Sequence, residues 1–373
     1  MSNVSEITNC YGCGVCTIAC NRKLISIELD KDGFYTPRIS DRERCTDCGL
    51  CTKVCAYQHD DVLMSHCEPQ GFAAWSTDAG IRHRCSSGGV GYEIGRSLMR
   101  QGYQLCGVRY NAEANRAEHY IAATEEQWAA SVGSKYIQSY TADALSKIDR
   151  KGRYLITGTP CQIDSLRRYL RSFHAEDHFV LLDFFCHGVP SMLIWDKYIR
   201  GVERHIGKAT HVAWRDKTHG WHDSWAMSLH GDTDEKVYTS RVSQGDSFYQ
   251  LFLGNQCLGK ACYHDCKYKH LSSAADIRIG DLWGTTYKDN EKGVSALIAL
   301  TEKGKQVIAA TETITLTPHA IEVITEGQMN HRLSYPTIMR PLQLLLAKTR
   351  VPITWQALVS RYVNKLKNKL HLP

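Results

Sequence analysis

Long apolar runs are missing from this sequence: no stretch of about 18 apolar residues occurs, the length that a membrane-spanning helix needs. The opening residues, MSNVSEITNC, also lack the basic-then-apolar order of a secretory signal. We therefore expect a cytoplasmic protein without a membrane span. Disulfides are rare in a reducing cytosol, so the 16 cysteines of the chain predict metal or redox chemistry instead.

Acidic residues are missing from residues 340–373, which carry seven basic side chains. These are Arg340, Lys348, Arg350, Arg361, Lys365, Lys367 and Lys369. The whole chain has 45 basic and 39 acidic residues, so the part outside this tail is close to neutral and gives no electrostatic reason to expect nucleic acid. The basic tail is a candidate for peripheral contact with an acidic partner or a membrane surface. The alternative is a basic helix that faces solvent.

Two cysteine quartets share the spacing C-x2-C-x2-C-x3-C, in CYGCGVCTIAC and CTDCGLCTKVC. In this spacing three cysteines hold one 4Fe-4S cluster and the fourth serves the other cluster. The predicted ligands are Cys10, Cys13, Cys16 and Cys55 for cluster one, and Cys45, Cys48, Cys51 and Cys20 for cluster two. Zinc, the alternative, rarely uses two interlocked quartets.

The proline that usually follows each fourth cysteine in bacterial ferredoxins is also missing, since Asn21 and Ala56 stand there. This leaves the ligands intact and alters the surroundings of the clusters. Residues 23–39 alternate apolar and polar side chains around Asp-Lys-Asp-Gly, which predicts a hairpin. We expect an α+β ferredoxin-like dicluster module over residues 1–65, and two clusters in series indicate electron transport.

From residue 66 onward, strand-like and helix-like segments alternate. Short apolar runs at 103–111, 153–158 and 179–185 predict strands, and the segments at 89–101, 161–173 and 190–203 have helical spacing. Further strands are predicted in 275–284 and at the start of 292–308, where a helix follows. This pattern predicts an α/β domain with a largely parallel sheet over residues 66–310, and then a C-terminal region at 311–373.

Three loops lie where such domains bind ligands: RCSSGG (84–89), TGTPCQ (157–162) and CHGVPS (186–191). Each leads into a helix, whose free N–H groups favour a phosphate such as a dinucleotide pyrophosphate. A plain helix-entry turn is the alternative. The G-x-G-x-x-G fingerprint is absent after the strands, so a standard nicotinamide fold is not supported. Cys161 and Cys186 end strands in these loops and are either reactive or ordinary buried thiols.

Two more segments carry candidate ligands. WRDKTHGWHDSW (214–225) sets Arg215 and Lys217 among tryptophans, which suits an anionic or planar ligand, or else the segment is a turn between two strands. NQCLGKACYHDCKY (255–268) holds three cysteines. Two interpretations remain for this segment. One is a zinc site, with His264 or His270 as the fourth ligand, and the other is a third 4Fe-4S cluster.

Several motifs together resemble the coenzyme F420 hydrogenase/dehydrogenase beta-subunit family. They are SSGGV (86–90), GSKYIQS (133–139), GTPCQI (158–163), CHGVPS (186–191), RDKTHGW (215–221), CYHDCKY (262–268) and ADIRIGDLWG (275–284). The resemblance spans roughly residues 1–305, with a ferredoxin module in front as in the family. The forms CHGVPS and GDLWG look most like a bacterial branch associated with surface polysaccharide synthesis.

This resemblance implies FAD in the α/β domain and a further 4Fe-4S cluster beside it. The FAD contacts that it implies are Ser86, Ser87, Gly88, Gly89, Ser134, Lys135, Thr159, Pro160 and Gln162, with Cys161 free to face the flavin. The implied cluster ligands are Cys262 and Cys266, joined by Cys186 or Cys161. We favour Cys186, because this choice leaves Cys161 free for the flavin. Cys257 is either a further ligand or a spare. Candidates to bind or protonate a substrate are Lys135, His187, Arg215 and Lys217.

We therefore expect a flavin-dependent iron–sulfur oxidoreductase that passes electrons through 4Fe-4S clusters to or from FAD and a small molecule, with a ferredoxin-like redox partner. The first alternative is an electron-transfer subunit of a larger complex that has no substrate of its own. A regulatory protein that uses its clusters as sensors is the second alternative, although a sensor needs only one labile site.

Overall fold

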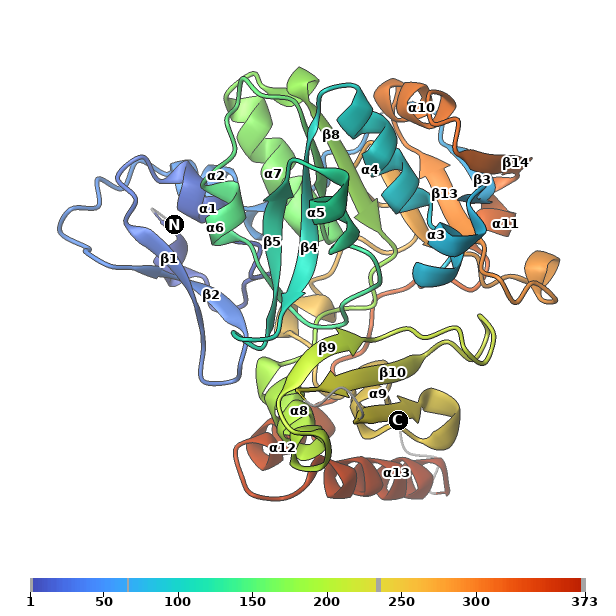
Figure 1. Ribbon diagram of the computed structural model, residues 1–373. Coiled ribbons are helices and arrows are strands. Elements are labelled where there is room, and N and C mark those ends of the chain that lie inside the picture. The colour runs from blue at the N-terminus through green and yellow to red at the C-terminus, as the bar shows by residue number, and fades with distance from the viewer. Residues whose placement is uncertain (1–2, 66, 233–235, 370–373) are drawn as a thin grey trace.

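The computed structural model describes residues 3–65, 67–232 and 236–369, leaving aside the side chains of 364–369 (Figure 1). The N-terminal module lies beside the large sheet and holds a two-stranded hairpin of β1 (Ile25–Leu29) and β2 (Tyr35–Ile39). The hairpin predicted between the two cysteine quartets is thereby confirmed. The remaining elements of this module are η1 (Val4–Glu6), α1 (Val15–Ala19), α2 (Leu50–Lys53) and η2 (Ala56–Gln58).

A nine-stranded sheet forms the centre of the molecule, in the order β14-β3-β13-β12-β8-β7-β4-β5-β6. The strands are β3 (Gln70–Ser76), β4 (Gln104–Asn111), β5 (Arg116–Ala122), β6 (Ser139–Tyr140), β7 (Tyr154–Thr157), β8 (Phe179–Phe184), β12 (Ile277–Asp281), β13 (Ser295–Ala299) and β14 (Ile314–His319). The strands predicted in 103–111, 153–158, 179–185 and 275–284 are confirmed.

The expectation of a largely parallel sheet is wrong, because the sheet is mixed. Strands β12, β8, β7 and β4 are parallel to one another, and β5 pairs parallel with β6. The pairs β14–β3, β3–β13, β13–β12 and β4–β5 are antiparallel. An apolar strand sequence indicates that both faces of the strand are buried. It does not indicate whether the neighbouring strand runs parallel or antiparallel, and this is why the prediction failed. The sheet also includes β14, which lies beyond the domain boundary expected at residue 310.

Helices cover both faces of this sheet, as the alternation of side chains along its strands requires. Tyr154 and Ile156 of β7 face the core under α7 (Pro160–Ser172), where the N-terminal module also packs. Leu155, between them, faces the opposite core under α4 (Val90–Arg100). The other helices around the sheet are α3 (Ala79–Arg84), α5 (Glu125–Ala129), α6 (Ala142–Leu145), η3 (Glu176–His178), η6 (Thr285–Tyr287), α10 (Glu302–Ala309) and α11 (Ile321–Thr325).

A second layer lies below the edge of the large sheet in Figure 1 and has its own aromatic core. It contains the three-stranded sheet of β9 (Ala209–Ala213), β10 (Ala226–Gly231) and β11 (Val237–Arg241). Its helices are α8 (Met192–Ile206), η4 (Val242–Gln244), α9 (Ser247–Leu253), η5 (Lys260–Cys262), α12 (Met339–Ala347) and α13 (Ile353–Lys369). None of the helices in the described ranges is both long and apolar enough to cross a bilayer.

Candidate functional site

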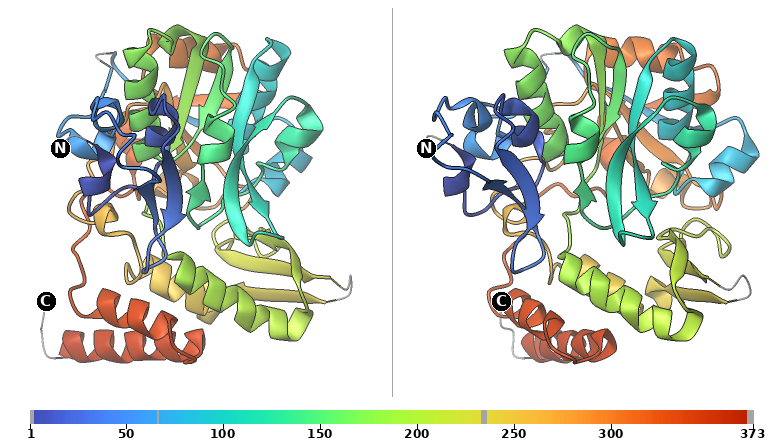
Figure 2. Two further views of the ribbon diagram at one scale, coloured as in Figure 1. Left: turned by 90° about the vertical axis from the view of Figure 1, so that its left-hand side faces the viewer. Right: turned by 60° about the vertical axis from the view of Figure 1, so that its left-hand side comes forward.

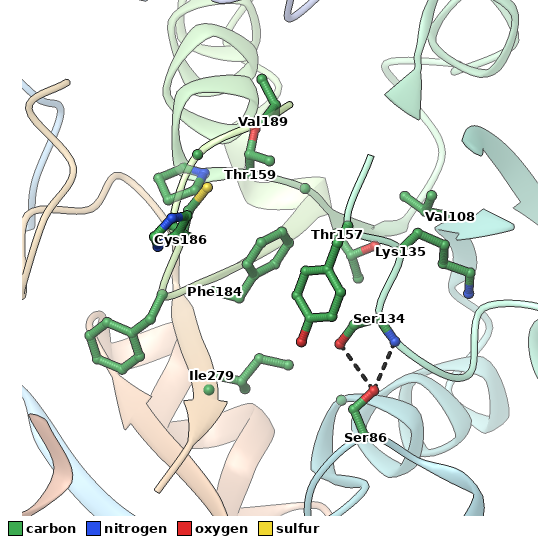
Figure 3. A pocket seen from close by; sticks show the side chains of 18 of the residues that line it. Ser86, Val108, Ser134, Lys135, Thr157, Thr159, Phe184, Cys186, Val189 and Ile279 are labelled. Carbon is green, nitrogen blue, oxygen red and sulfur yellow. Dashed lines mark hydrogen bonds between the residues drawn. The ribbon is translucent and has the colours of Figure 1, made fainter. Parts of the chain in front are cut away.

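A cavity of about 520 Å³ opens where β7, β8 and β12 end, between the large sheet and the second layer (Figure 3). The three loops singled out in the sequence all contribute to its wall, together with the segment 131–139. Because β12, β8, β7 and β4 run in the same direction, their carboxyl ends meet at one edge of the sheet. That edge is where α/β domains bind their ligands.

The SSGG loop enters α4 through Gly89, whose φ of +87° favours glycine. The structure shows no side-chain hydrogen bond capping this helix start, so its first N–H groups remain available toward the cavity. The Oγ of Ser86 accepts hydrogen bonds from the N–H of Ser134 at 2.8 Å and from its hydroxyl at 3.0 Å, as the dashed lines in Figure 3 show. These bonds join two segments that hold implied FAD contacts, around Ser86 and Ser134, into one wall of the cavity.

Gly88 serves packing and does not line the cavity. A Cβ on Gly88 would stand 2.3 Å from the carbonyl oxygen of Ala74, so only glycine allows this loop to lie on β3. The N–H of Gly88 donates to Ser295, and the hydroxyl of Ser87 donates to the carbonyl of Val294. The glycine therefore lets the loop fit against the sheet, while Ser86, Ser87 and Gly89 form the surface of the cavity.

At the start of α7, the predicted helix entry is confirmed, with Thr159 as N-cap and Pro160 in the first turn. The side-chain oxygen of Gln162 accepts from the N–H of Thr159 at 2.8 Å, and its amide nitrogen donates to Ser139. The polar atoms of Gln162 thus already hold the helix start in place. Thr159, Pro160, Cys161 and Gln162 all line the cavity.

Lys135 lines the cavity, but its ammonium group is occupied by the protein. Its Nζ donates to the main-chain carbonyls of residues 130, 131, 132 and 133 at 2.9–3.2 Å, and the side chain points away from Cys186 (Figure 3). Burial lowers the pKa of Lys135 to about 7. Its role in the structure is to hold the turn that precedes Ser134.

His187 also lines the cavity, and it is neutral at pH 7. Burial and then the nearby Lys269 lower the pKa of His187 to about 4. Its Nε2 donates to the carbonyl of Phe252 at 3.2 Å, and the ring makes an edge contact with Phe252. Of the four residues proposed to act on a substrate, Lys135 and His187 are the two that the structure brings to the cavity.

Arg215 and Lys217 lie behind the cavity wall instead of lining it. The guanidinium of Arg215 donates to Asp281 at 2.9 Å and to the hydroxyl of Ser224 at 2.6 Å. The Nζ of Lys217 donates to the carbonyls of Arg82, Ser87 and Lys292 at 2.6–3.0 Å. Their segment, 214–225, connects the antiparallel strands β9 and β10, which confirms the alternative interpretation as a turn between strands. These cations support the wall from outside.

Four cysteines from distant parts of the chain line the same cavity: Cys161, Cys186, Cys262 and Cys266. Burial raises the pKa of Cys262 to about 12, and Cys266 and Cys186 contribute to the rise. Burial likewise raises the pKa of Cys161, to which Cys186, Cys13 and Cys262 contribute. The structure therefore brings both strand-end cysteines, Cys161 and Cys186, to the same cavity wall as Cys262 and Cys266.

Cys257 is not brought into this group. It is fully buried, does not line the cavity, and its carbonyl accepts from the N–H of Ser191. Burial raises its pKa to about 12, against a lowering effect of Arg340. Of the two histidines considered for a zinc site, His264 is exposed and His270 lines the cavity.

The structure places the cysteines of each predicted ferredoxin set near one another, although among the described residues no three His, Cys, Asp or Glu side chains are arranged to hold a metal ion. A separate cavity of about 210 Å³ is lined by all four cysteines of the second set, Cys20, Cys45, Cys48 and Cys51. In the first set, burial raises the pKa of Cys16 well above its usual value, and Cys13, Cys10 and Cys55 raise it further. Cys51 contributes to the same rise, so the two sets are neighbours.

Tyr11 connects the first set with the cavity. Its hydroxyl donates to the carbonyl of Asp265 at 2.7 Å, and its ring contacts Tyr57 and Tyr268 edge-on at 5.2 and 5.8 Å between centroids. Burial raises the pKa of Tyr11, and so do the nearby Cys161, Cys266 and Cys262. Tyr11 also lines the cavity and follows Cys10 directly in the chain.

Sequence reasoning missed several residues of this site. Tyr136 stacks on Trp225 at 4.7 Å and both line the cavity. Lys269, which is buried, donates to the carbonyls of Cys186 and His187 at 2.9 and 3.1 Å. Tyr136 lies inside the motif GSKYIQS, which therefore contained a signal for it. Nothing in the sequence pairs Lys269 with the loop after β8.

Comparison with known proteins finds two family models that match parts of this chain. Residues 151–322 match the family described as the C terminus of the coenzyme F420 hydrogenase/dehydrogenase beta subunit, and residues 9–59 match the 4Fe-4S dicluster domain. No curated protein matches the chain. A solved structure of the F420-reducing NiFe hydrogenase complex from Methanosarcina barkeri includes a similar chain, at 17% identity over 79% of this chain and 89% of that one, with a TM-score of 0.48.

Proposed function

Residues 151–322 match the family of the coenzyme F420 hydrogenase/dehydrogenase beta subunit, and residues 9–59 match the 4Fe-4S dicluster domain. From these matches we propose that the chain is an iron–sulfur flavoprotein oxidoreductase of this family. In this proposal it passes electrons between a protein partner at the N-terminal module and a small molecule in the cavity. The observation that supports it most is the gathering of Cys161, Cys186, Cys262 and Cys266 on the wall of the same cavity that the SSGG loop lines.

Each of the three cysteine sets contains four thiols, the number of ligands that a cubane takes, and this supports iron–sulfur clusters. We propose that the three sets of four hold three clusters, with Cys257 outside the third. Cys51 of the second set contributes to the raised pKa of Cys16 in the first set, and Cys13 of the first set contributes to the raised pKa of Cys161 in the third. The sets therefore follow one another from the module to the cavity, an order that suits electron transfer over short distances.

The cavity wall fits FAD in its chemistry. The helix start at Gly89 has no side-chain cap and suits a pyrophosphate, and the Ser86–Ser134 pair adds polar atoms beside it. Trp225, Tyr136 and other apolar side chains suit a flat ring system. When bound, a flavin supplies the exchange between single electrons and a hydride equivalent.

The lysines that line the cavity have little capacity to bind a substrate, because their ammonium groups already have partners in the protein. Lys135 and Lys269 both donate to main-chain carbonyls, so they stabilise the loops around the cavity. His187 is neutral and its Nε2 is held by Phe252, which fixes the orientation of its ring in the wall. We propose that His187 positions the substrate as a neutral hydrogen-bonding group. A role in surface polysaccharide synthesis rests only on the forms CHGVPS and GDLWG.

The metal and flavin content of anaerobically purified protein tests the proposal. We expect roughly twelve iron atoms per chain, four for each cluster, together with one FAD. A content of about eight iron atoms per chain would mean that only the two clusters of the dicluster module are present and that the third cluster is absent. Iron near four, zinc in place of iron, or the absence of flavin at full iron content would contradict the proposal.

A second candidate function is electron transfer within a larger complex, without a substrate of this chain's own. One specific observation favours it: Cys48 of the second set is exposed, so this set faces the outside of the molecule, where a partner protein can approach. Turnover separates the two candidates. A self-contained reductase reduces a defined small molecule with dithionite or reduced ferredoxin, whereas a protein that works only within a complex co-purifies with its partner and shows little turnover alone.

A further inference from the structure

The last helix, α13, packs against the molecule with its less apolar side. Gln356, Ala357 and Ser360 are buried, and Ser360 accepts a hydrogen bond from the amide of Gln256. The side-chain amide of Gln343, on α12, donates to the carbonyl of Gln356 at 3.2 Å. One large apolar residue, Ile353, is also buried in the core of the second layer. Beyond it, polar bonds and a small residue attach α13 to the body of the protein, where an ordinary surface helix would bury more of its large apolar side chains.

The opposite side of α13 carries large apolar residues that face solvent. Trp355, Leu358 and Tyr362 are 62%, 51% and 66% exposed. They stand at i, i+3 and i+7, so they form one stripe along the helix, which we call the α13 apolar stripe. Of the nine large apolar side chains that are exposed in the described ranges, five lie between residues 338 and 362. Single exposed apolar residues are ordinary, but a cluster of them marks an interaction surface.

The charged residues of the C-terminal segment all have the same sign. From residue 327 to 373 the sequence contains eight Lys or Arg residues and no Asp or Glu. Four of these have partners in the structure. Arg340 donates to the carbonyl of Leu258, and Lys348 pairs with Asp32. Arg332 donates to the carbonyl of His264, and Arg361 donates to the side chain of Gln250 and to the carbonyl of Gly245. Arg350 is exposed, and α13 itself includes four basic residues in its sequence. Two copies of such a surface repel each other, which argues against a symmetric dimer through the stripe.

We propose that the α13 apolar stripe binds an anionic lipid bilayer from one side, so that this protein is a peripheral membrane protein. Tryptophan, tyrosine and leucine beside basic residues are the composition of helices that lie in the membrane interface, where the rings sit at the headgroup level and the cations meet anionic lipid. Figures 1 and 2 show α13 along the end of the molecule away from the large sheet, so a flat surface can reach it. This inference does not depend on the proposed redox function.

Vesicle co-sedimentation of the full-length protein tests the proposal. We expect binding to phosphatidylcholine vesicles that contain phosphatidylglycerol, weaker binding to phosphatidylcholine alone, and a loss of binding as salt is raised, because the attraction to anionic lipid is screened. The combined variant Trp355→Ala, Leu358→Ala and Tyr362→Ala removes the stripe on an exposed helix face. We expect it to lower the partition coefficient about tenfold or more.

The matched control is the variant Leu29→Ala with Val237→Ala, which removes exposed apolar side chains of 45% and 47% exposure elsewhere on the molecule. It should bind vesicles like the wild type, and all proteins should keep the same iron content as a check on folding. The proposal is overturned if the wild type ignores anionic vesicles, if the stripe variant binds as well as the control, or if the stripe variant alters only the mass measured by light scattering, which would indicate contact between copies of the chain.

Discussion

The ammonium of Lys135 donates to four main-chain carbonyls, and that of Lys217 donates to three. Arg215 is held between Asp281 and Ser224, with its guanidinium over the rings of Trp225 and Trp283 at 5.0 and 5.3 Å. The sequence made all three candidates to bind or protonate a substrate. A buried cation must be paired, and here the pairing groups belong to the walls of the cavity. These residues position the site by holding its loops together.

The cysteines of the segment NQCLGKACYHDCKY have different surroundings, and single substitutions can distinguish their roles. We expect Cys266→Ser to lose about four iron atoms per chain, because Cys266 lines the cavity beside Cys186 and Cys262. Cys257→Ala is the matched variant, since Cys257 is buried away from the cavity wall, and it should keep the full iron content. Iron analysis with electron paramagnetic resonance measures both. Equal losses in the two variants would place Cys257 among the ligands, and collapse of the module's signals in Cys266→Ser would show that the sites are not separate.

Among the elements, a few contacts hold the N-terminal module against the large domain, and the proposed function requires these contacts for electrons to reach the cavity. Gly14 begins α1 with a φ of +76°, and a Cβ there would stand 2.0 Å from the hydroxyl oxygen of Thr141. That hydroxyl donates to the carbonyl of Cys13 at 3.0 Å. Ser165 of α7 adds a second contact, as its hydroxyl accepts from the N–H of Ala56. The module is therefore fixed through backbone groups next to its own cysteines.

Gly14→Ala tests this docking contact. The substitution inserts a methyl group where Thr141 meets the module, so we expect it to cost about 2 kcal/mol or more beyond the strain of a positive φ, with loss of iron from the first set. Gly102→Ala is the control, because its φ is +83° and nothing lies within 4 Å of the added Cβ. It should cost only about 1–2 kcal/mol. Thermal unfolding and limited proteolysis compare them, and identical behaviour would show that the module is not held at Gly14.

At the scale of the whole molecule, one edge of a mixed sheet collects groups that lie far apart in sequence. The parallel strands β12, β8, β7 and β4 direct their following loops to the same place, and the antiparallel strands extend the sheet on both sides. The second layer and the N-terminal module then close around that edge, and both reach the wall of the cavity through Phe252 and Tyr11. The site therefore depends on the packing of all three parts.

Global stability should fall in mild acid because of a histidine buried inside this sheet. Burial lowers the pKa of His119 to about 4, although its Nε2–H donates to the carbonyl of Thr157 at 3.0 Å. The unfolded chain takes up this proton near pH 6.5, so stability is full above that pH and declines toward pH 4. Between pH 7 and pH 5 we expect a loss of about 2 kcal/mol from this group.

Urea unfolding of the wild type and of His119→Gln at these two pH values measures the effect. Glutamine keeps a donor for the carbonyl of Thr157 and has no proton to gain, so the variant should lose less stability in acid than the wild type. If both proteins lose the same amount, then His119 is not the group responsible.

Features that depend on local spacing could be predicted from the sequence alone. The hairpin between the cysteine sets, the strands at 103–111, 153–158 and 179–185, and the helix entries at 89 and 159 are confirmed. The division of eight cysteines into two interlocked sets stays a prediction. Each of these follows from periodicity, capping chemistry or ligand spacing within a few residues.

Only the tertiary structure decided which groups meet. It gave the sheet its mixed directions, brought Cys161 and Cys186 together with Cys262 and Cys266, left Cys257 aside, and turned Arg215 and Lys217 away from the cavity. The physical reason is that strand direction and side-chain pairing depend on neighbours a hundred or more residues away, as for Lys217 and Ser87. A buried charge takes whichever partner the fold brings to it, and the sequence around that charge does not record the partner.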